Sequence, residues 1–196
     1  MHANHTILVT GATGTIGRPL VDLLVGEGAT VRAVTRHPQA TGLPAPVEIV
    51  AGDPARPATL APFLAGVSSL LLHPRAVGDA AGELLALARE RGVRRVVALS
   101  AVNVDDDLAA QPSRYTGDKN KEVEDAAVGS GLEWVSLRAS AFADNALRAW
   151  GARSAPGTSS VARTRPSPRR RSTNGTWPRS APARCSALRW WATSWS

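Results

Sequence analysis

A glycine-rich segment near the N-terminus has the residue types and the spacing that bind phosphate. Residues 10–17 read TGATGTIG, so three glycines stand three residues apart between an apolar run and a helix-like segment. The first glycine permits a tight turn, the second lets the backbone approach a pyrophosphate, and the third lets the helix pack closely on the strand. The alternative is a turn that binds nothing, but a strand before and a helix after it favour binding. The expected dinucleotide contacts are Gly11, Thr13, Gly14, Thr15, Ile16 and Gly17.

Three further residues follow apolar runs that we expect to be strands. Arg36 stands where an acidic residue would favour NAD, and an arginine there can hold a 2′-phosphate, so NADP(H) is favoured over NAD(H). Arg32 lies on the same expected strand. Asp53 can meet the adenine amino group, although an aspartate there can equally form a turn. His73 ends the fourth expected strand at the carboxyl edge, where ligands bind, and is a further candidate contact.

Tyr115, Lys119 and Ser100 are the candidate catalytic residues. The tyrosine and the lysine stand four residues apart, which places both side chains on one face of a helix. A nearby ammonium helps a phenol to pass a proton to a carbonyl or alcohol oxygen, which Ser100 would orient. The alternative is that Lys119 is one of several solvated charges on that helix. No metal-ligand spacing occurs among the four histidines and the single cysteine.

The elements that position these residues alternate between short apolar runs and amphipathic segments. The expected strands are 6–10, 30–35, 47–51, 69–72, 93–99 and 133–137, with Trp134 in the core. The expected helices are 18–26, 58–64, 76–91 and 117–129. Gly28, Gly66, Gly92 and Gly131 stand where these helices should end and the next strands begin. Strands this apolar are typical of a parallel sheet covered by helices on both faces, so the sequence predicts an α/β doubly wound (Rossmann) fold.

Several segments together resemble the NmrA-like branch of the atypical short-chain dehydrogenases/reductases. They are TGATGTIG, Gly52-Asp53, ALSAVNV, NKEVEDAAVGSGLEWVSLR and Phe142-Ala143-Asp144-Asn145, and the resemblance covers roughly residues 5–150. Where the family commonly has LRP, Ala139 follows Arg138 here. A lysine that some members carry aligns nearer Asn120 than Lys119, and many members lack the tyrosine–lysine pair.

The resemblance implies an NADPH-dependent oxidoreductase that acts on a small carbonyl, quinone or related acceptor. The same family includes redox sensors that bind NADP without turning it over and act through a protein partner, so a non-enzymatic sensor is the alternative. The expected partner of the enzyme is a small-molecule substrate. No apolar run approaches the ~20 residues of a membrane span. With one cysteine and no leader-like segment, we expect a cytoplasmic protein.

The composition changes near residue 151. Residues 1–150 hold 14 Lys and Arg against 16 Asp and Glu, whereas residues 151–196 hold nine Arg, no acidic residue and four of the six Trp. The entropy of ordering the second part exceeds what its few apolar residues return, so we expect a Rossmann domain over 1–150 and a disordered tail over 151–196. The alternative is a nucleic-acid contact through Arg169-Arg170-Arg171 and Trp190-Trp191.

A shifted reading frame explains this tail better. If each codon is read from the free third base of the preceding one, the residues from Gly157 onward yield a hydrophobic, helix-patterned sequence, and 173–176 become DERD. That sequence resembles the substrate-binding portion expected in NmrA-like proteins. We therefore predict a frameshift near Gly151–Ser154, which would remove that portion and impair catalysis, and a contact with nucleic acid is expected only if the tail is genuine.

Overall fold

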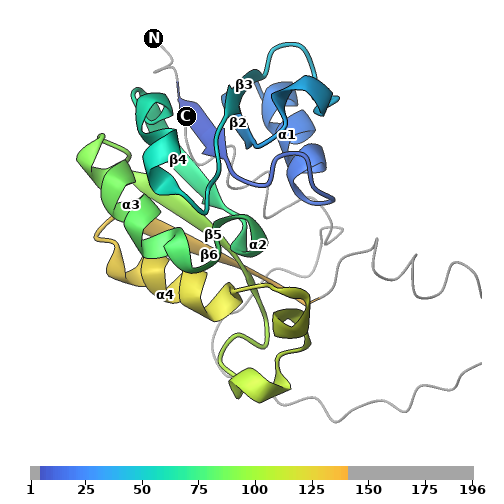
Figure 1. The fold of residues 1–196 in the computed structure, drawn as a ribbon, viewed down its shortest axis with the longest axis vertical. Coiled ribbons are helices and arrows are strands. Elements are labelled where there is room, and N and C mark those ends of the chain that lie inside the picture. The colour runs from blue at the N-terminus through green and yellow to red at the C-terminus, as the bar shows by residue number, and fades with distance from the viewer. Residues whose placement is uncertain (1–4, 141–196) are drawn as a thin grey trace, which may run out of the picture. The chain divides into compact units, whose positions relative to one another are not determined.

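The computed structural model describes residues 5–140. Six strands form one parallel sheet in the order β3-β2-β1-β4-β5-β6 (Figure 1). They are β1 (Thr6–Val9), β2 (Thr30–Thr35), β3 (Glu48–Ala51), β4 (Val67–Leu72), β5 (Arg95–Ala101) and β6 (Glu133–Ala139). The strand order reverses between β1 and β4, so the predicted doubly wound Rossmann sheet is confirmed. The predicted tail 151–196 lies outside the described residues.

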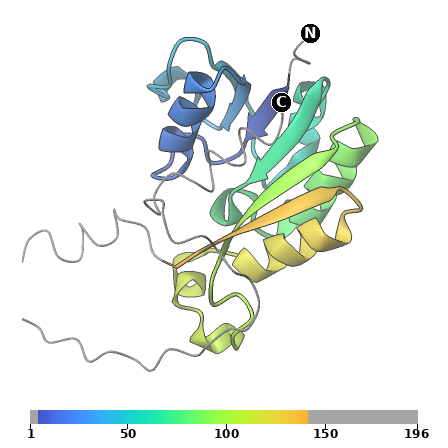
Figure 2. The same ribbon diagram turned by 180° about the vertical axis from the view of Figure 1, so that it is seen from behind.

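Four α-helices connect these strands, and they cover the sheet unequally. They are α1 (Gly17–Gly26), α2 (Pro74–Val77), α3 (Ala81–Glu90) and α4 (Asn120–Gly129). Leu8 and Val96 belong to the core that joins the sheet to α3 and α4. Ile7 and Val9 are also buried, but strand residues alternate between faces, so they face α1 instead. Figure 2 shows β5 and β6 from the face opposite α4.

Two of the predicted helices are irregular. The segment predicted as a helix over 58–64 is a 3-10 helix, Pro57–Phe63, and Pro62 inside it has no amide hydrogen for a regular helical bond. The helix predicted over 76–91 is divided, because Gly78 has a φ of 54° and interrupts the α-helical path between α2 and α3.

Two further expectations at the far side of the sheet were wrong. The helix predicted over 117–129 begins only at residue 120, because Gly117, with a φ of 89°, ends a separate 3-10 helix, Pro112–Thr116. Trp134 was predicted to lie in the core, but it is 46% exposed. It lies on β6, the edge strand of the described sheet, which has a neighbour on one side only.

The turn between β1 and α1 is closely packed at Gly17. A Cβ added at Gly17 would lie 2.1 Å from the carbonyl oxygen of Gly11 and 2.7 Å from the Cα of Ala12. Real Cβ atoms do not approach backbone atoms so closely, and backbone cannot move aside as a flexible side chain can. The third glycine of the motif is therefore required by packing, as the sequence predicts.

We predict that Gly17→Ala lowers the free energy of unfolding by about 3 kcal/mol or more, because the added methyl group meets backbone. Gly26→Ala is the matched control at the other end of α1, where an added Cβ meets nothing within 4 Å. There, alanine leaves stability unchanged or raises it by up to about 1 kcal/mol. Urea unfolding of both variants is the measurement, and equal effects at the two positions would contradict the packing argument.

Candidate functional site

The turn after β1 and the end of β4 meet at the carboxyl edge of the sheet. Gly11 has a φ of 67°, and a Cβ there would lie 2.9 Å from the Cβ of His73. The hydroxyl of Thr10 donates to the carbonyl of Leu71 at 2.9 Å and accepts from the amide of His73 at 2.8 Å. These contacts bring the glycine-rich turn and His73, both predicted from the sequence, to the same point.

His73 presents an unsatisfied polar atom at this point. Its Nδ1 is buried and has no hydrogen-bond partner among residues 5–140. Burial lowers the pKa of the imidazole, although the nearby carboxylate of Asp118 opposes the shift. The ring is therefore neutral at pH 7. A buried polar nitrogen without a partner is costly, so this atom is suited to a ligand at the sheet edge.

The start of α1 offers an uncompensated positive end to the same edge. Ile16 makes no side-chain capping bond to the helix, and the first turn contains no acidic residue. The amide of Gly14 donates to the carbonyl of Gly11 at 3.0 Å and closes the turn. Thr13, Gly14 and Thr15 are exposed. Free amides and the helix dipole at such an end favour an anion.

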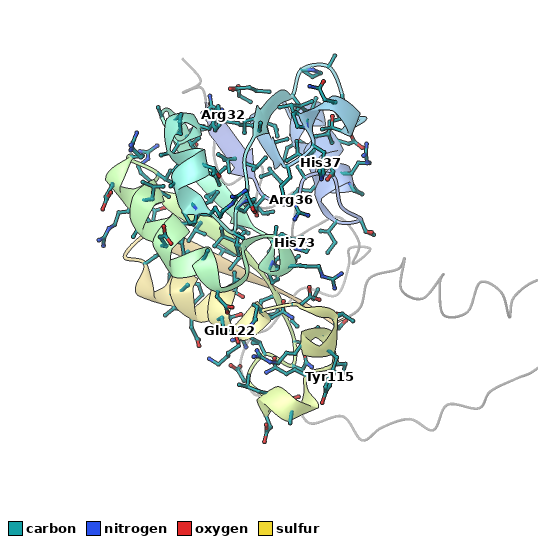
Figure 3. The ribbon with its side chains drawn as sticks, in the orientation of Figure 1. Arg32, Arg36, His37, His73, Tyr115 and Glu122 are labelled. Atoms are coloured by element: carbon teal, nitrogen blue, oxygen red, sulfur yellow. The ribbon has the colours of Figure 1, made fainter. Side chains whose placement is uncertain are left out.

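The two arginines of β2 and its end differ in their surroundings. Arg36 is exposed and makes no hydrogen bond or ion pair within the described part of the chain. Arg32 is engaged instead: its Nε donates to Glu48 at 2.8 Å, and its Nη1 donates to the carbonyls of Phe63 and Ala65. Arg32 lies within β2, whereas Arg36 directly follows the last residue of that strand (Figure 3). Arg32 thus serves the fold and adds no free charge at the carboxyl edge.

Asp53 lies at the end of β3 and forms a turn, which is the alternative weighed from the sequence. Its Oδ1 accepts from the amide of Ala55 at 3.1 Å, and its Oδ2 accepts from Nε of Arg56 at 3.3 Å. A Cβ at the preceding residue, Gly52, would lie 2.3 Å from Leu60, so this turn is closely packed. A carboxylate has about four acceptor positions, so these bonds leave capacity for an amino group.

Tyr115 and Lys119 are not stacked on one helix, so that geometric prediction was wrong. Tyr115 lies in the 3-10 helix, is 83% exposed, and donates to the carbonyl of Ala109 at 3.4 Å. Lys119 is the residue before α4, and its Nζ pairs with Asp79 at 3.2 Å. Gly117 stands between the two and changes the direction of the chain. The spacing of four residues would align them only on a continuous helix.

Ser100, the third candidate catalytic residue, lies beside an ionic cluster, built around the buried Glu124, that sequence reasoning missed. Glu124 of α4 is 6% exposed, and it accepts from Ser136 at 2.5 Å and from Nε of Arg138 at 3.0 Å. Arg138 also donates from Nη1 to Asp105, in the loop after β5, at 2.7 Å. The Ser100 hydroxyl is near enough to the Glu124 carboxylate to help lower its pKa, although its oxygen makes no regular hydrogen bond with the described residues.

The cluster stabilises the ionised form of the Glu124 carboxyl group. Burial by itself would raise the pKa of Glu124, but hydrogen bonds from Arg138 and Ser136, together with the nearby hydroxyl of Ser100, lower it to about 2. The cluster joins α4, β6 and the loop after β5, and so it fixes one side of the sheet edge. The sequence held a signal for it, because Glu124 shares a helix face with the buried residues Asn120, Val123 and Ala127.

No helix in the described part of the chain is long and apolar enough to cross a membrane. Within residues 5–140, no three His, Cys, Asp or Glu side chains gather in a way that could hold a metal ion.

A glycine-rich turn at the point where a parallel sheet reverses its strand order is typical of nucleotide-binding Rossmann proteins. The chain belongs to the NAD(P)H-binding family, whose family model matches residues 11–165. That match includes the glycine turn, Arg36, Asp53 and His73.

Curated relatives and solved structures agree with this membership. The chain is 31% identical over 146 residues to the NAD(P)H azoreductase of Xenophilus azovorans, covering 72% of this chain and 50% of that protein. It is 34% identical over 147 residues to the (4-alkanoyl-5-oxo-2,5-dihydrofuran-3-yl)methyl phosphate reductase of Streptomyces griseus, covering 72% and 49%. The chain therefore spans about half the length of these relatives. The structure of Citrobacter sp. triphenylmethane reductase complexed with NADP(H) shares the fold, with a TM-score of 0.59 and 24% identity over 74% of this chain and 54% of that chain.

The low pKa of Glu124 predicts how the stability of this edge depends on pH. Because the pKa of this carboxyl is about 2 in the folded chain and 4.5 in an unperturbed glutamate, its contribution is present above pH 4.5 and is lost as the pH falls toward 2. Glu124→Gln should lower the free energy of unfolding by about 2 to 3 kcal/mol at pH 7, and by less than half of that at pH 3.

Denaturant unfolding at the two pH values tests this, with Glu133→Gln as the control. Glu133 pairs with Arg95, but its side chain is 68% exposed, so its replacement should change stability by at most about 0.5 kcal/mol at either pH. A deficit in Glu124→Gln that stays constant with pH would rule out the ionised pair as its source.

Proposed function

We propose that the chain binds NADP(H) at the carboxyl edge of the sheet, as a member of the NmrA-like branch. The observation that carries this proposal is the meeting of Gly11, the start of α1 and His73 at one point. The family match supports the nicotinamide dinucleotide. Arg36, which is exposed and has no ion-pair partner among residues 5–140, supports the 2′-phosphate.

The residues present fit this group. The glycines let the turn close on itself, because a Cβ at Gly11 would meet His73 and one at Gly17 would meet backbone, and the exposed residues before the helix start, 13–15, would face a pyrophosphate. Arg36 would hold the 2′-phosphate and Asp53 the adenine. The buried Nδ1 of His73 would face the bound dinucleotide where β4 ends.

The proposed activity is reduction of a small carbonyl, quinone or related acceptor. The relatives named as an NAD(P)H azoreductase and as a reductase of a (dihydrofuranyl)methyl phosphate support a reductase of small organic molecules. When bound, NADPH supplies the hydride. Tyr115, with Ser100 and Lys119, remains the sequence-based candidate for passing a proton to the acceptor. The neutral His73 and the cluster around Glu124 would hold the surrounding edge in place.

A non-enzymatic NADP(H) sensor is the second candidate. It is favoured by one observation, that Lys119 is paired with Asp79 rather than directed to Tyr115. We also retain the proposal that residues 151–196 are encoded in a shifted frame. It rests on the composition of those residues and on the helix-patterned sequence that the offset frame yields, and those residues lie outside the described part of the chain.

We predict that Arg36→Gln weakens NADPH binding by roughly 10- to 100-fold and leaves NADH binding within about twofold. Charge-assisted hydrogen bonds to a phosphate contribute about 1.5–3 kcal/mol, and only NADPH carries that phosphate. Fluorescence titration of both nucleotides is the measurement. Arg94→Gln is the control, since Arg94 is also exposed but lies at the opposite end of the sheet, before β5. Equal weakening of both nucleotides would contradict the assignment.

Enzyme and sensor give different results in one assay of the full chain. If the chain is an oxidoreductase, NADPH oxidation accelerates with at least one member of a panel of quinones, azo compounds and carbonyls. Tyr115→Phe should then lower kcat by roughly 100-fold or more without changing the Kd for NADPH, because proton donation contributes about that factor. Tight NADPH binding with no turnover across the panel would favour the sensor.

A further inference from the structure

Arg18, the residue directly after the glycine motif, joins α1 to the loop that follows β2. Its Nη1 donates to the carbonyl of Gly42 at 2.6 Å, and its Nη2 donates to the carbonyl of Thr41 at 2.5 Å. One guanidinium thus holds two successive peptide carbonyls that lie more than 20 residues further along the chain. No sequence pattern marked this contact.

The loop is shaped to make this contact. Gly42 has a φ of 57°, and a Cβ added there would lie 3.2 Å from Nη1 of Arg18, so the backbone approaches the guanidinium closely. Thr41 is 5% exposed, and its hydroxyl accepts from the amide of Leu43 at 3.4 Å. The positive φ and the buried threonine fix the direction of both carbonyls toward Arg18.

The same loop begins at Arg36. The hydroxyl of Thr35, the last residue of β2, accepts from the amide of His37 at 3.1 Å and holds the start of the loop. Figure 3 shows Arg36 and His37 leaving the end of β2. Arg18 therefore restrains the far end of a short segment whose near end carries the free arginine.

The charges of this region are unbalanced. Among residues 5–140, neither Arg18 nor Arg36 forms an ion pair with a carboxylate. The Thr41 and Gly42 carbonyls engage two of the five guanidinium donors of Arg18, and its charge is not balanced by a carboxylate among these residues. A purely mechanical link between a helix and a loop needs no charge, whereas two uncompensated cations at one loop suit a phosphate.

We infer that Arg18 is a positioning residue for NADP(H) selectivity: by holding Thr41 and Gly42 it fixes the loop that presents Arg36 to the 2′-phosphate. This inference rests on the proposed binding of NADP(H). The ligand class is a dinucleotide with a phosphate on its adenosine ribose.

The test is the Kd of the full chain and its variants for NADPH and NADH, with 2′,5′-ADP and ADP as the corresponding fragments. Arg18→Met should weaken NADPH and 2′,5′-ADP by roughly tenfold and leave NADH and ADP within about twofold, because only the phosphate depends on the placement of Arg36. Arg18→Lys should recover part of the loss, since an ammonium cannot hold two carbonyls in one fixed plane.

The double variant Arg18→Met/Arg36→Gln separates positioning from an independent contact. If Arg18 acts through Arg36, the double variant binds NADPH about as weakly as Arg36→Gln alone. Arg91→Met is the matched control, because Nη1 of Arg91 also donates to a carbonyl, that of Ala61 at 3.3 Å, after the end of α3. It should change neither nucleotide.

The failures can be told apart. If the unaltered chain shows no preference for NADPH, or Arg36→Gln leaves that preference intact, the proposed function fails and this inference with it. If Arg36→Gln abolishes the preference but Arg18→Met weakens both nucleotides equally, or neither, only the inference is overturned. Should Arg18→Met not fold, Arg18→Lys decides, because unchanged selectivity in that variant would also overturn it.

Discussion

The backbone at Gly17 lies so close to the carbonyl of Gly11 that not even a methyl group fits between them, and this approach constrains the path of the chain. Because α1 must pass so near the turn that precedes it, its direction is set within a few residues of β1. That direction aims the free amides of the helix start at the carboxyl edge of the sheet. It also seats Gly11 against His73, so one backbone approach defines both the proposed phosphate site and its neighbour on β4.

From this point the edge divides into two halves with different chemistry. On the side of β2 and β3, the cations Arg18 and Arg36 have no balancing carboxylate in the described chain. On the side of β5 and β6, charges are paired, and the buried carboxylate of Glu124 is matched by the fork of Arg138. An open positive half is suited to capture an anionic ligand, whereas a satisfied ionic half gives a rigid frame. The asymmetry agrees with a dinucleotide whose charged end lies toward β2.

Sequence alone predicted the parts of this structure that local rules determine. The apolar runs predicted all six strands, and the glycine spacing predicted the turn at Gly11, because each follows from nearby residues. Prediction failed where a single glycine overrode the helical pattern around it, or where a residue far along the chain supplied the deciding partner. Gly78 and Gly117 interrupt segments whose apolar periodicity is helical. Glu124 was missed because an acidic residue is ordinarily exposed, and its partner Arg138 comes 14 residues later on another element.

The tyrosine and lysine show why spacing is weaker evidence than geometry. Two ion pairs cross between the segment after β4 and the start of α4: Arg75 binds Asp118 at 3.0 Å, and Lys119 binds Asp79 at 3.2 Å. The neighbours Asp118 and Lys119 thus pair with Arg75 and Asp79, which have the opposite charges. Two such pairs together orient the peptide at 118–119 more firmly than either exposed pair alone. The Nζ of Lys119 is therefore held by Asp79 and is not directed to Tyr115, so the spacing of four residues does not bring the two side chains together. His73 precedes the same segment, and its ring carries a buried Nδ1 without a hydrogen-bond partner among residues 5–140, at the point where the glycine-rich turn meets the end of β4.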